Sequence, residues 1–502
     1  MLSIRPKSLS LTALAAFLVV AVGIQLVMIT TMPIITTFDT QALLNGIANN
    51  AFPGFSIFAA SVGLVSADTV VYLLACHGVM SLVICLAPIH LALLHARLAV
   101  ALILGIALLA SMAPFVFSVW LLNFHLYTFA LVALVWCYGM TVLCGNWRYA
   151  IFLGGALWLA HISRPTGGML FVVLGLAVVI SSFAHREQVR ARLSRFAVAG
   201  IAFVLLLLAQ GYLLPSSARS GDVFSDVKAR WLFCQMYAQS GVQGRTPLML
   251  EGAPSLDFMA GALRKALVED PTVLPPLIAR WPEYFGRYEA DGRRLAEDII
   301  HNRQPMNDQV DHKFCWVVFS VLDKSFGADR ANRILTDSWH EFVVAHPAAV
   351  VTSVYLPELM AYFFEPPRYN QVPPFSNDIG TSILGPGLYS EIYGIGVPAE
   401  SSGINKLVYR YVYSVYTLLT PILCVFALLS LFVIFSKRRY APVLLLCFGI
   451  VLYHGVATAI SNVVVFPYVF VVYPQWIALM TAGLFVSLSF LQKARRWRLS
   501  RC

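Results

Sequence analysis

Apolar residues run in long, nearly uninterrupted stretches along this chain. A helix needs about 20 mostly apolar residues to cross the hydrocarbon layer of a bilayer. The first stretch follows Arg5 and Lys7 like a signal peptide, but no Ala-x-Ala-like cleavage site comes after it, so we expect a retained anchor. The pattern predicts ten membrane spans, which lie near residues 10–32, 69–93, 98–116, 121–144, 149–163, 168–184, 196–214, 408–435, 441–460 and 468–490.

The composition agrees with this pattern. Apolar residues make up 59% of the 502 residues and charged residues 12%, and the mean hydropathy is +0.75. Soluble domains are about half apolar and about one quarter charged, so the composition excludes an ordinary soluble fold. The sequence therefore predicts an all-α polytopic membrane protein.

Basic residues fall at every second junction between the predicted spans. Short cytoplasmic loops hold Lys and Arg, whereas short exported loops lack them, so both termini are expected in the cytoplasm. The formal net charge of +10 then follows from topology, and nucleic acid is not an expected partner. The residues that set this orientation are Arg5, Lys7, Arg97, Arg148, Arg186, Arg190, Arg192, Arg195, Lys437, Arg438, Arg439, Lys493, Arg495, Arg496, Arg498 and Arg501.

Acidic residues are concentrated in one long segment, because 22 of the 25 Asp and Glu residues lie within 222–400. The predicted topology places this segment outside the cytoplasm. We therefore expect a transmembrane module at 1–214, a mostly α extracytoplasmic domain at 215–405, and a second transmembrane module with a basic tail at 406–502.

Two further segments follow from the same topology. Residues 33–66 form the first exported loop. The apolar helix near 347–364 is long enough to suggest a span, but one more crossing would place Lys437–Arg439 outside the cytoplasm. We expect this helix to lie at the membrane interface.

Cysteine usage leaves two alternatives open. Of nine cysteines, Cys234 and Cys315 belong to the predicted exported domain. An oxidising compartment could join them, and two buried free thiols are the other interpretation. No Cys and His spacing resembles a zinc site.

Three polar residues are predicted to converge on the exported side of the bundle: Asp39, His125 and Arg164. Each also has an ordinary structural explanation. Asp39 could cap a helix starting at Thr40, His125 could be an interface residue, and Arg164 could extend to lipid headgroups. Arg164 is the one basic residue predicted in a short exported loop, which suggests an anionic partner.

An isolated carboxylate and an arginine at an exported membrane face suit sugar transfer from a lipid phosphate. The phosphate lies at headgroup depth, where an arginine can bind it and stabilise its developing charge. The acceptor hydroxyl needs a general base, which Asp39 can supply. No second acidic residue lies beside Asp39, so a divalent metal is not favoured.

Four motifs occur in a fixed order along most of the chain. They are Phe38-Asp39-Thr40 with Ala51-Phe52-Pro53-Gly54-Phe55, Ala113-Pro114-Phe115-Val116 before Trp120–His125, Ser163-Arg164-Pro165-Thr166-Gly167, and His340–Pro347 before an apolar helix. Their order resembles the GT-C superfamily of polyprenyl-phosphate-sugar-dependent glycosyltransferases. The likeness is to its protein-mannosyltransferase-like and lipid A aminoarabinose transferase-like branch.

The resemblance implies a GT-C-like fold and an inverting glycosyltransferase with Asp39 as the catalytic base. The family's last span opens with Arg-Tyr where this chain has Phe466-Pro467-Tyr468, which leaves Arg164 as the main donor-phosphate ligand. Lys406 and Arg410 complete the predicted phosphate site. The predicted substrate cavity consists of Trp120, Asn123, His125 and Arg368.

The implied partners are a polyprenyl-phosphate sugar, a glycan, lipid or protein acceptor, and membrane lipids, with no cofactor. The implied location is the bacterial inner membrane, with both termini cytoplasmic and the large domain periplasmic. Two other classes stay open: a polysaccharide polymerase or ligase that uses a diphosphate carrier, and a transporter or flippase of polyprenyl-linked substrates.

Overall fold

The computed structural model consists of helices joined by turns and irregular segments, and its described residues include no strand. The chain divides into two compact units. The first comprises residues 1–220, 363–454 and 465–502, and the second comprises residues 221–362 and 455–464. The structure describes residues 7–31, 69–96, 98–116, 118, 123–184, 189–213, 222–270, 272–288, 291–305, 312–364, 407, 411, 414, 422, 424–434, 440–461 and 470–499.

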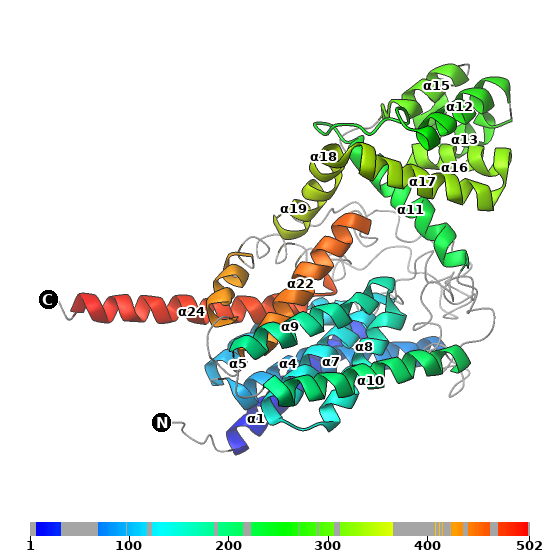
Figure 1. Ribbon diagram of the computed structural model, residues 1–502. Coiled ribbons are helices and arrows are strands. Elements are labelled where there is room, and N and C mark those ends of the chain that lie inside the picture. Colours follow the sequence, from blue (N-terminus) through cyan, green and yellow to red (C-terminus); the bar gives the residue numbers. More distant parts are fainter. Residues whose placement is uncertain are drawn as a thin grey trace. The chain divides into compact units, whose positions relative to one another are not determined.

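The first unit is built from apolar helices. Helices α4, α7, α8 and α10 pack against one another in the order of the chain, and Figure 1 shows α7, α8 and α10 side by side. The described helices are α1 (Lys7–Thr31), α4 (Thr69–His95), α5 (Leu98–Ser111), α6 (Ala113–Val116), α7 (Asn123–Cys144), α8 (Arg148–Ser163), η2 (Pro165–Met169), α9 (Leu170–Ala184), α10 (Val189–Leu213), α22 (Ala441–Ser461) and α24 (Tyr473–Leu499).

Seven helices of the described chain are long and apolar enough to cross a membrane: Leu9–Met28, Ala75–His95, Phe124–Cys144, Val189–Gln210, Pro347–Phe364, Ala441–Ile460 and Tyr473–Gln492. This confirms the prediction of an all-α polytopic membrane protein. Three shorter apolar helices, Leu98–Ser111, Gly167–Ser182 and Cys424–Ile434, lie within other predicted spans. The count of ten spans stays a prediction, as do the GT-C-like fold and the orientation.

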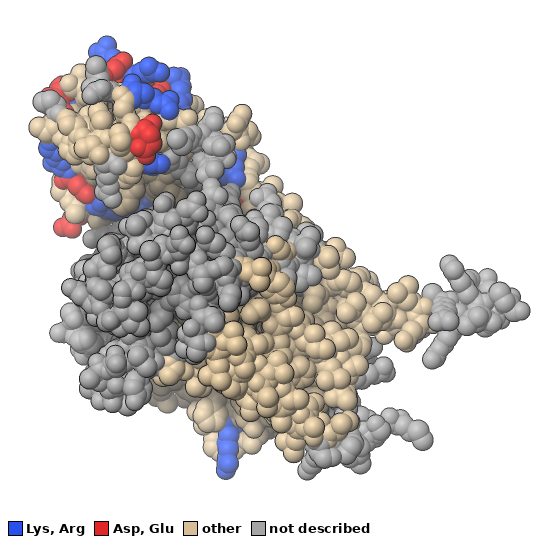
Figure 2. Space-filling model, turned by 180° about the vertical axis from the view of Figure 1, so that it is seen from behind, with Lys and Arg blue, Asp and Glu red and all other residues tan. Residues whose placement is uncertain are grey.

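The outer surface of the first unit is suited to lipid. On α10, Ile201, Leu205 and Leu208 are exposed by 60%, 60% and 63%, at the spacing of one helix face. In Figure 2, charged side chains gather over the second unit, whereas the described surface of the first unit seen in that view is almost entirely of other residue types. Such an apolar surface is stable where the solvent is hydrocarbon.

The second unit is a helical domain with its own core. Amphipathic helices bury aromatic side chains such as Tyr284, Phe314 and Phe342, all 0% exposed. The Cys234–Cys315 disulfide joins the first helix to the sixth, so the alternative of two free thiols is wrong. The helices are α11 (Asp222–Ser240), α12 (Pro254–Glu269), α13 (Leu274–Arg280), α14 (Pro282–Phe285), α15 (Gly292–Ile300), α16 (Lys313–Phe326), α17 (Ala328–Ala345), α18 (Pro347–Val350) and α19 (Leu356–Phe364), with the 3₁₀ helix η5 (Gly286–Tyr288) and the π-helix η6 (Val351–Tyr355).

The segment from α18 to α19 begins within this core. Val350 and Val354 are each 1% exposed and belong to the hydrophobic cluster of the second unit. Between α18 and α19 the backbone forms the π-helix η6. Residues 347–362 of this segment belong to the second unit, and the interfacial position of the segment in a membrane stays a prediction.

Candidate functional site

Three predicted site residues lie in or close to the first turns of α7. Arg164 follows α8 directly, His125 lies in the first turn of α7, and Asn123 is the residue at which α7 begins. The other predicted site residues lie outside the described residues: Asp39, Trp120, Arg368, Lys406 and Arg410.

The turn that carries Arg164 is set by its neighbours. Arg164 has extended backbone (φ −150°, ψ 143°), and its N–H donates to Ala160 O at 3.1 Å. Pro165 opens the short helix η2, a position that its fixed φ favours. A Cβ on Gly167 would lie 2.0 Å from Ala160 O. Glycine is therefore required at position 167, which gives the Arg-Pro-Thr-Gly motif a structural reason.

The guanidinium group of Arg164 packs on aromatic rings of α7. Its Cζ lies 4.7 Å from the centroid of the Phe124 ring and 5.7 Å from that of Tyr127. The Tyr127 ring lies 6.0 Å from the ring of the buried His454 on α22. Cation–π contacts contribute about 0.5 to 2 kcal/mol, so these rings hold the cation at the first turns of α7.

His125 is buried in the contact between α7 and α4. Its Nε2 lies 2.9 Å from His77 O and 3.1 Å from Ser81 Oγ. A carbonyl oxygen only accepts, so the bond to His77 O requires the proton on Nε2. The two imidazole rings lie 5.0 Å apart. These contacts tie α7 to α4 beside the candidate site.

A chain of hydrogen bonds continues from this pair to α1. His77 Nδ1 lies 3.2 Å from Ser118 O, and Gln25 Nε2 donates to Ser118 Oγ at 2.8 Å. Ser81 Oγ lies 2.8 Å from Pro114 O. Buried polar groups in an apolar bundle are costly unless they are hydrogen-bonded. This network therefore fixes the relative positions of α1, α4, α6 and α7.

The His125 side chain and the guanidinium group of Arg164 lie on different faces of α7. His125 lines a small pocket together with Thr128 and side chains of α5, α6 and the start of α24. Arg164 lies against Phe124 and Tyr127. Successive residues of an α-helix are about 100° apart, so the pair 124 and 127 and the pair 125 and 128 point in different directions. The two residues lie near the start of α7 but on different faces of the helix.

The residues that sequence reasoning missed are the polar groups inside apolar spans. These are Gln25, His77, Ser81 and His454, all buried. Their signal in the sequence is that polar side chains within spans are rare and are placed inside the bundle. No group of three or more His, Cys, Asp or Glu side chains suited to a metal ion occurs in the described part of the chain.

Comparison of the chain with family models, characterised proteins and solved structures gives no match. A functional argument therefore depends on this chain's own residues. The strongest of these is Arg164, because its turn, its aromatic support and its place near the start of α7 are all described.

Proposed function

We propose that this chain is an integral membrane glycosyltransferase that moves a sugar from a polyprenyl phosphate to an acceptor hydroxyl on the exported face. The observation that carries the proposal is Arg164, held against the rings of Phe124 and Tyr127 at the start of α7. The planar fork of N–H donors on an arginine suits a phosphate, which it binds in a bidentate manner.

The reaction needs one base and one cation. The acceptor oxygen attacks C1 of the sugar and its proton passes to the Asp39 carboxylate. The bond between C1 and the phosphate oxygen breaks, and its electron pair leaves with the polyprenyl phosphate. Arg164 stabilises the charge that grows on that phosphate, and Lys406 and Arg410 are proposed to assist it. Attack opposite the leaving phosphate inverts the configuration at C1.

The remaining parts have supporting roles in this proposal. The hydrogen bonds of His125 favour a structural role, since they fix α7 beside Arg164. The second unit is proposed to lie on the exported, periplasmic side and to cover the acceptor. Its disulfide supports an oxidising compartment, and the distribution of basic residues supports cytoplasmic termini.

A transfer assay with the reconstituted full chain tests the function. Radiolabelled polyprenyl-phosphate sugars serve as donors, and envelope glycan, lipid and protein fractions serve as acceptors. General bases contribute about 10² to 10⁴ in rate, so Asp39→Asn should lower turnover by that factor. Asp68→Asn, at the next acidic residue along the chain, is the matched control and should keep turnover within about twofold.

Arg164 is tested in the same assay. Arg164→Gln should lower turnover strongly. Arg164→Lys should keep part of the turnover, because lysine retains the positive charge but lacks the planar guanidinium group that binds phosphate in a bidentate manner. Normal turnover by Asp39→Asn would remove the base assignment. Transfer that occurs from a diphosphate-linked glycan, and from no monophosphate donor, would identify a polymerase or ligase. Movement of the donor across vesicles without cleavage would identify a transporter.

A further inference from the structure

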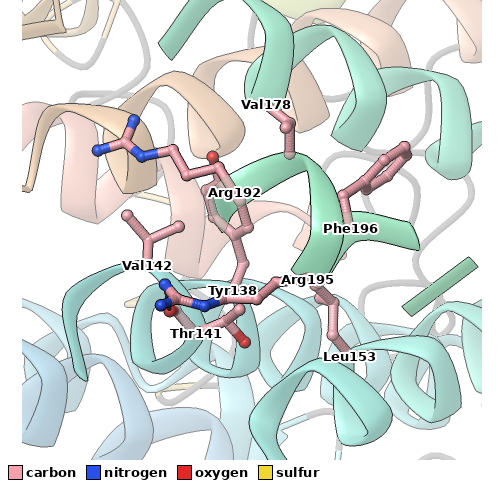
Figure 3. A pocket seen from close by; sticks show the side chains of 8 residues that line it. All are labelled: Tyr138, Thr141, Val142, Leu153, Val178, Arg192, Arg195 and Phe196. Carbon is pink, nitrogen blue, oxygen red and sulfur yellow. Dashed lines mark hydrogen bonds between the residues drawn. The ribbon is translucent and has the colours of Figure 1, made fainter. Parts of the chain in front are cut away.

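A basic pocket lies at the other end of α7, where α7 and α9 end and α10 begins. Figure 3 shows its lining, and the polar members are Tyr138, Thr141, Arg192 and Arg195. From His125 to Tyr138 the helix rises by about 20 Å, at roughly 1.5 Å per residue. This pocket is therefore separate from the candidate site near Arg164.

Main-chain carbonyl groups position both arginine side chains. Arg192 is 7% exposed, and its Nη1 donates to Ser181 O near the end of α9 at 3.0 Å. Arg195 donates to Thr141 O near the end of α7 at 3.2 Å. The final carbonyl groups of a helix carry partial negative charge and commonly accept such bonds. One role of both arginines is thus to cap these two helix ends.

Arg192 and Arg195 are three residues apart on α10, where like charges repel. An anion beside both side chains would reduce this repulsion. Figure 3 shows the two side chains extending in the same direction from α10. Tyr138 also lines the pocket, whereas the Thr141 hydroxyl donates within its own helix to Cys137 O at 2.7 Å. Two guanidinium groups and the Tyr138 hydroxyl are donors that match the oxygens of a phosphate, which arginine binds with charge-assisted hydrogen bonds.

The predicted topology places this end of the bundle at the cytoplasmic leaflet. Arg148 at the start of α8 and Arg190 in the first turn of α10 are exposed and lie at the same end. Anionic phospholipids in that leaflet attract basic residues next to spans, and basic pockets between helices bind their headgroups. We propose that this pocket binds the phosphate of an anionic phospholipid of the cytoplasmic leaflet. The proposal is independent of the reaction on the exported face.

Lipid retention by the purified full chain tests the proposal. The protein in neutral detergent is titrated with phosphatidylglycerol or phosphatidylcholine, and bound lipid is counted by native mass spectrometry beside a thermal unfolding curve. We expect phosphatidylglycerol to be retained and to raise the unfolding temperature, and phosphatidylcholine to do neither. Loss of one charge-assisted contact should weaken retention roughly tenfold.

Arg195→Gln is the main variant, because Arg195 is only partly buried, and Arg192→Gln is the second. Arg190→Gln is the matched control, since Arg190 lies on the same helix and outside the lining of the pocket. We expect both pocket variants to lose retention and the control to keep it. If Arg192→Gln fails to fold because α9 loses its cap, the comparison of phosphatidylglycerol retention between Arg195→Gln and Arg190→Gln tests the proposal without it.

Three results would overturn the proposal. Equal losses for Arg195→Gln and Arg190→Gln would mean diffuse attraction to the membrane surface. Equal retention of phosphatidylglycerol and phosphatidylcholine would mean that the phosphate charge is not recognised. Stabilisation by inorganic phosphate, with no further change on adding phosphatidylglycerol, would mean that the ligand is a soluble anion.

Discussion

Reduction of the Cys234–Cys315 disulfide should strongly destabilise the second unit. The bond joins positions 81 residues apart. In the chain-entropy model, a closed loop of this length stabilises the fold by about 4.5 kcal/mol. Cys234 and Cys315 are 3% and 0% exposed, so the cross-link lies in the core between α11 and α16. The predicted loss is a large share of the about 5 to 15 kcal/mol that stabilises a typical domain.

Hydrogen exchange of the full chain measures this loss locally. About 4.5 kcal/mol corresponds to about a thousandfold faster exchange for amides that open with the whole unit. Peptides from α11 and α16 should show this change after reduction, and peptides from α4 should not. Cys85→Ser is the matched control, since Cys85 is a buried free cysteine of the first unit. It should respond to reductant as the unchanged protein does.

The double variant Cys234→Ser with Cys315→Ser separates the bond from other effects of the reductant. It should exchange rapidly from the start, and reductant should change nothing further. Exchange that differs by less than tenfold between the oxidised and reduced protein would refute the stabilising role. Alkylation of both cysteines in the unreduced, denatured protein would show that the bond does not form.

Further predictions concern a turn, an exposed ion pair and a buried charge. Gly167→Ala should lower stability by about 1 to 3 kcal/mol, because its Cβ would overlap a backbone oxygen, whereas Gly155→Ala, which meets nothing within 4 Å, should be neutral or slightly stabilising in thermal unfolding. Hydrogen bonds from Lys324, the largest cause, and from Thr272 lower the pKa of Asp270 from 3.8 to about 2. This lowered pKa stabilises the fold above pH 3.8, and the stabilisation is lost as the pH falls through about 2. Lys324→Met should therefore raise the pH midpoint of acid unfolding of the second unit. Glu358→Gln should lower the free energy of unfolding by about 3 kcal/mol in a denaturant titration, because the Glu358 side chain is 0% exposed and neutralises the partly buried Arg245. An unchanged denaturation midpoint would mean that this ion pair is not formed.

The sequence predicts the spans well because crossing a membrane depends on a local property, the length of an apolar stretch. Six of the seven candidate spans coincide with predicted ones. The seventh, Pro347–Phe364, has the length and composition of a span, but was predicted as interfacial from the alternation of basic residues. The structure adds that its first turns, at Val350 and Val354, pack in the core of the second unit, which no local pattern indicates.

The site could be predicted only in part, since its contacts join residues far apart in the chain. Arg164 is conspicuous in the sequence because a basic residue is unusual in a short loop that is predicted to be exported. Its support by Phe124 and Tyr127 depends on how α8 packs against α7. The bond between His125 and His77 spans 48 residues and depends on the packing of α7 against α4. The sequence therefore identifies such residues, but it does not show which residues they contact in the fold.

The two arginine sites at the ends of α7 give the topology an independent test. The helix has 22 residues, and at roughly 1.5 Å per residue it spans about 33 Å, close to the thickness of a hydrocarbon layer of about 30 Å. The predicted topology then places Arg164 and the pair Arg192 and Arg195 at headgroup depth in opposite leaflets. Arg164→Gln should therefore change sugar transfer and leave phosphatidylglycerol retention unaltered, whereas Arg195→Gln should do the reverse. If Arg195→Gln abolished transfer while Arg164→Gln did not, α7 would have to cross the membrane in the opposite direction, and the donor phosphate would have to bind at the end where α10 begins.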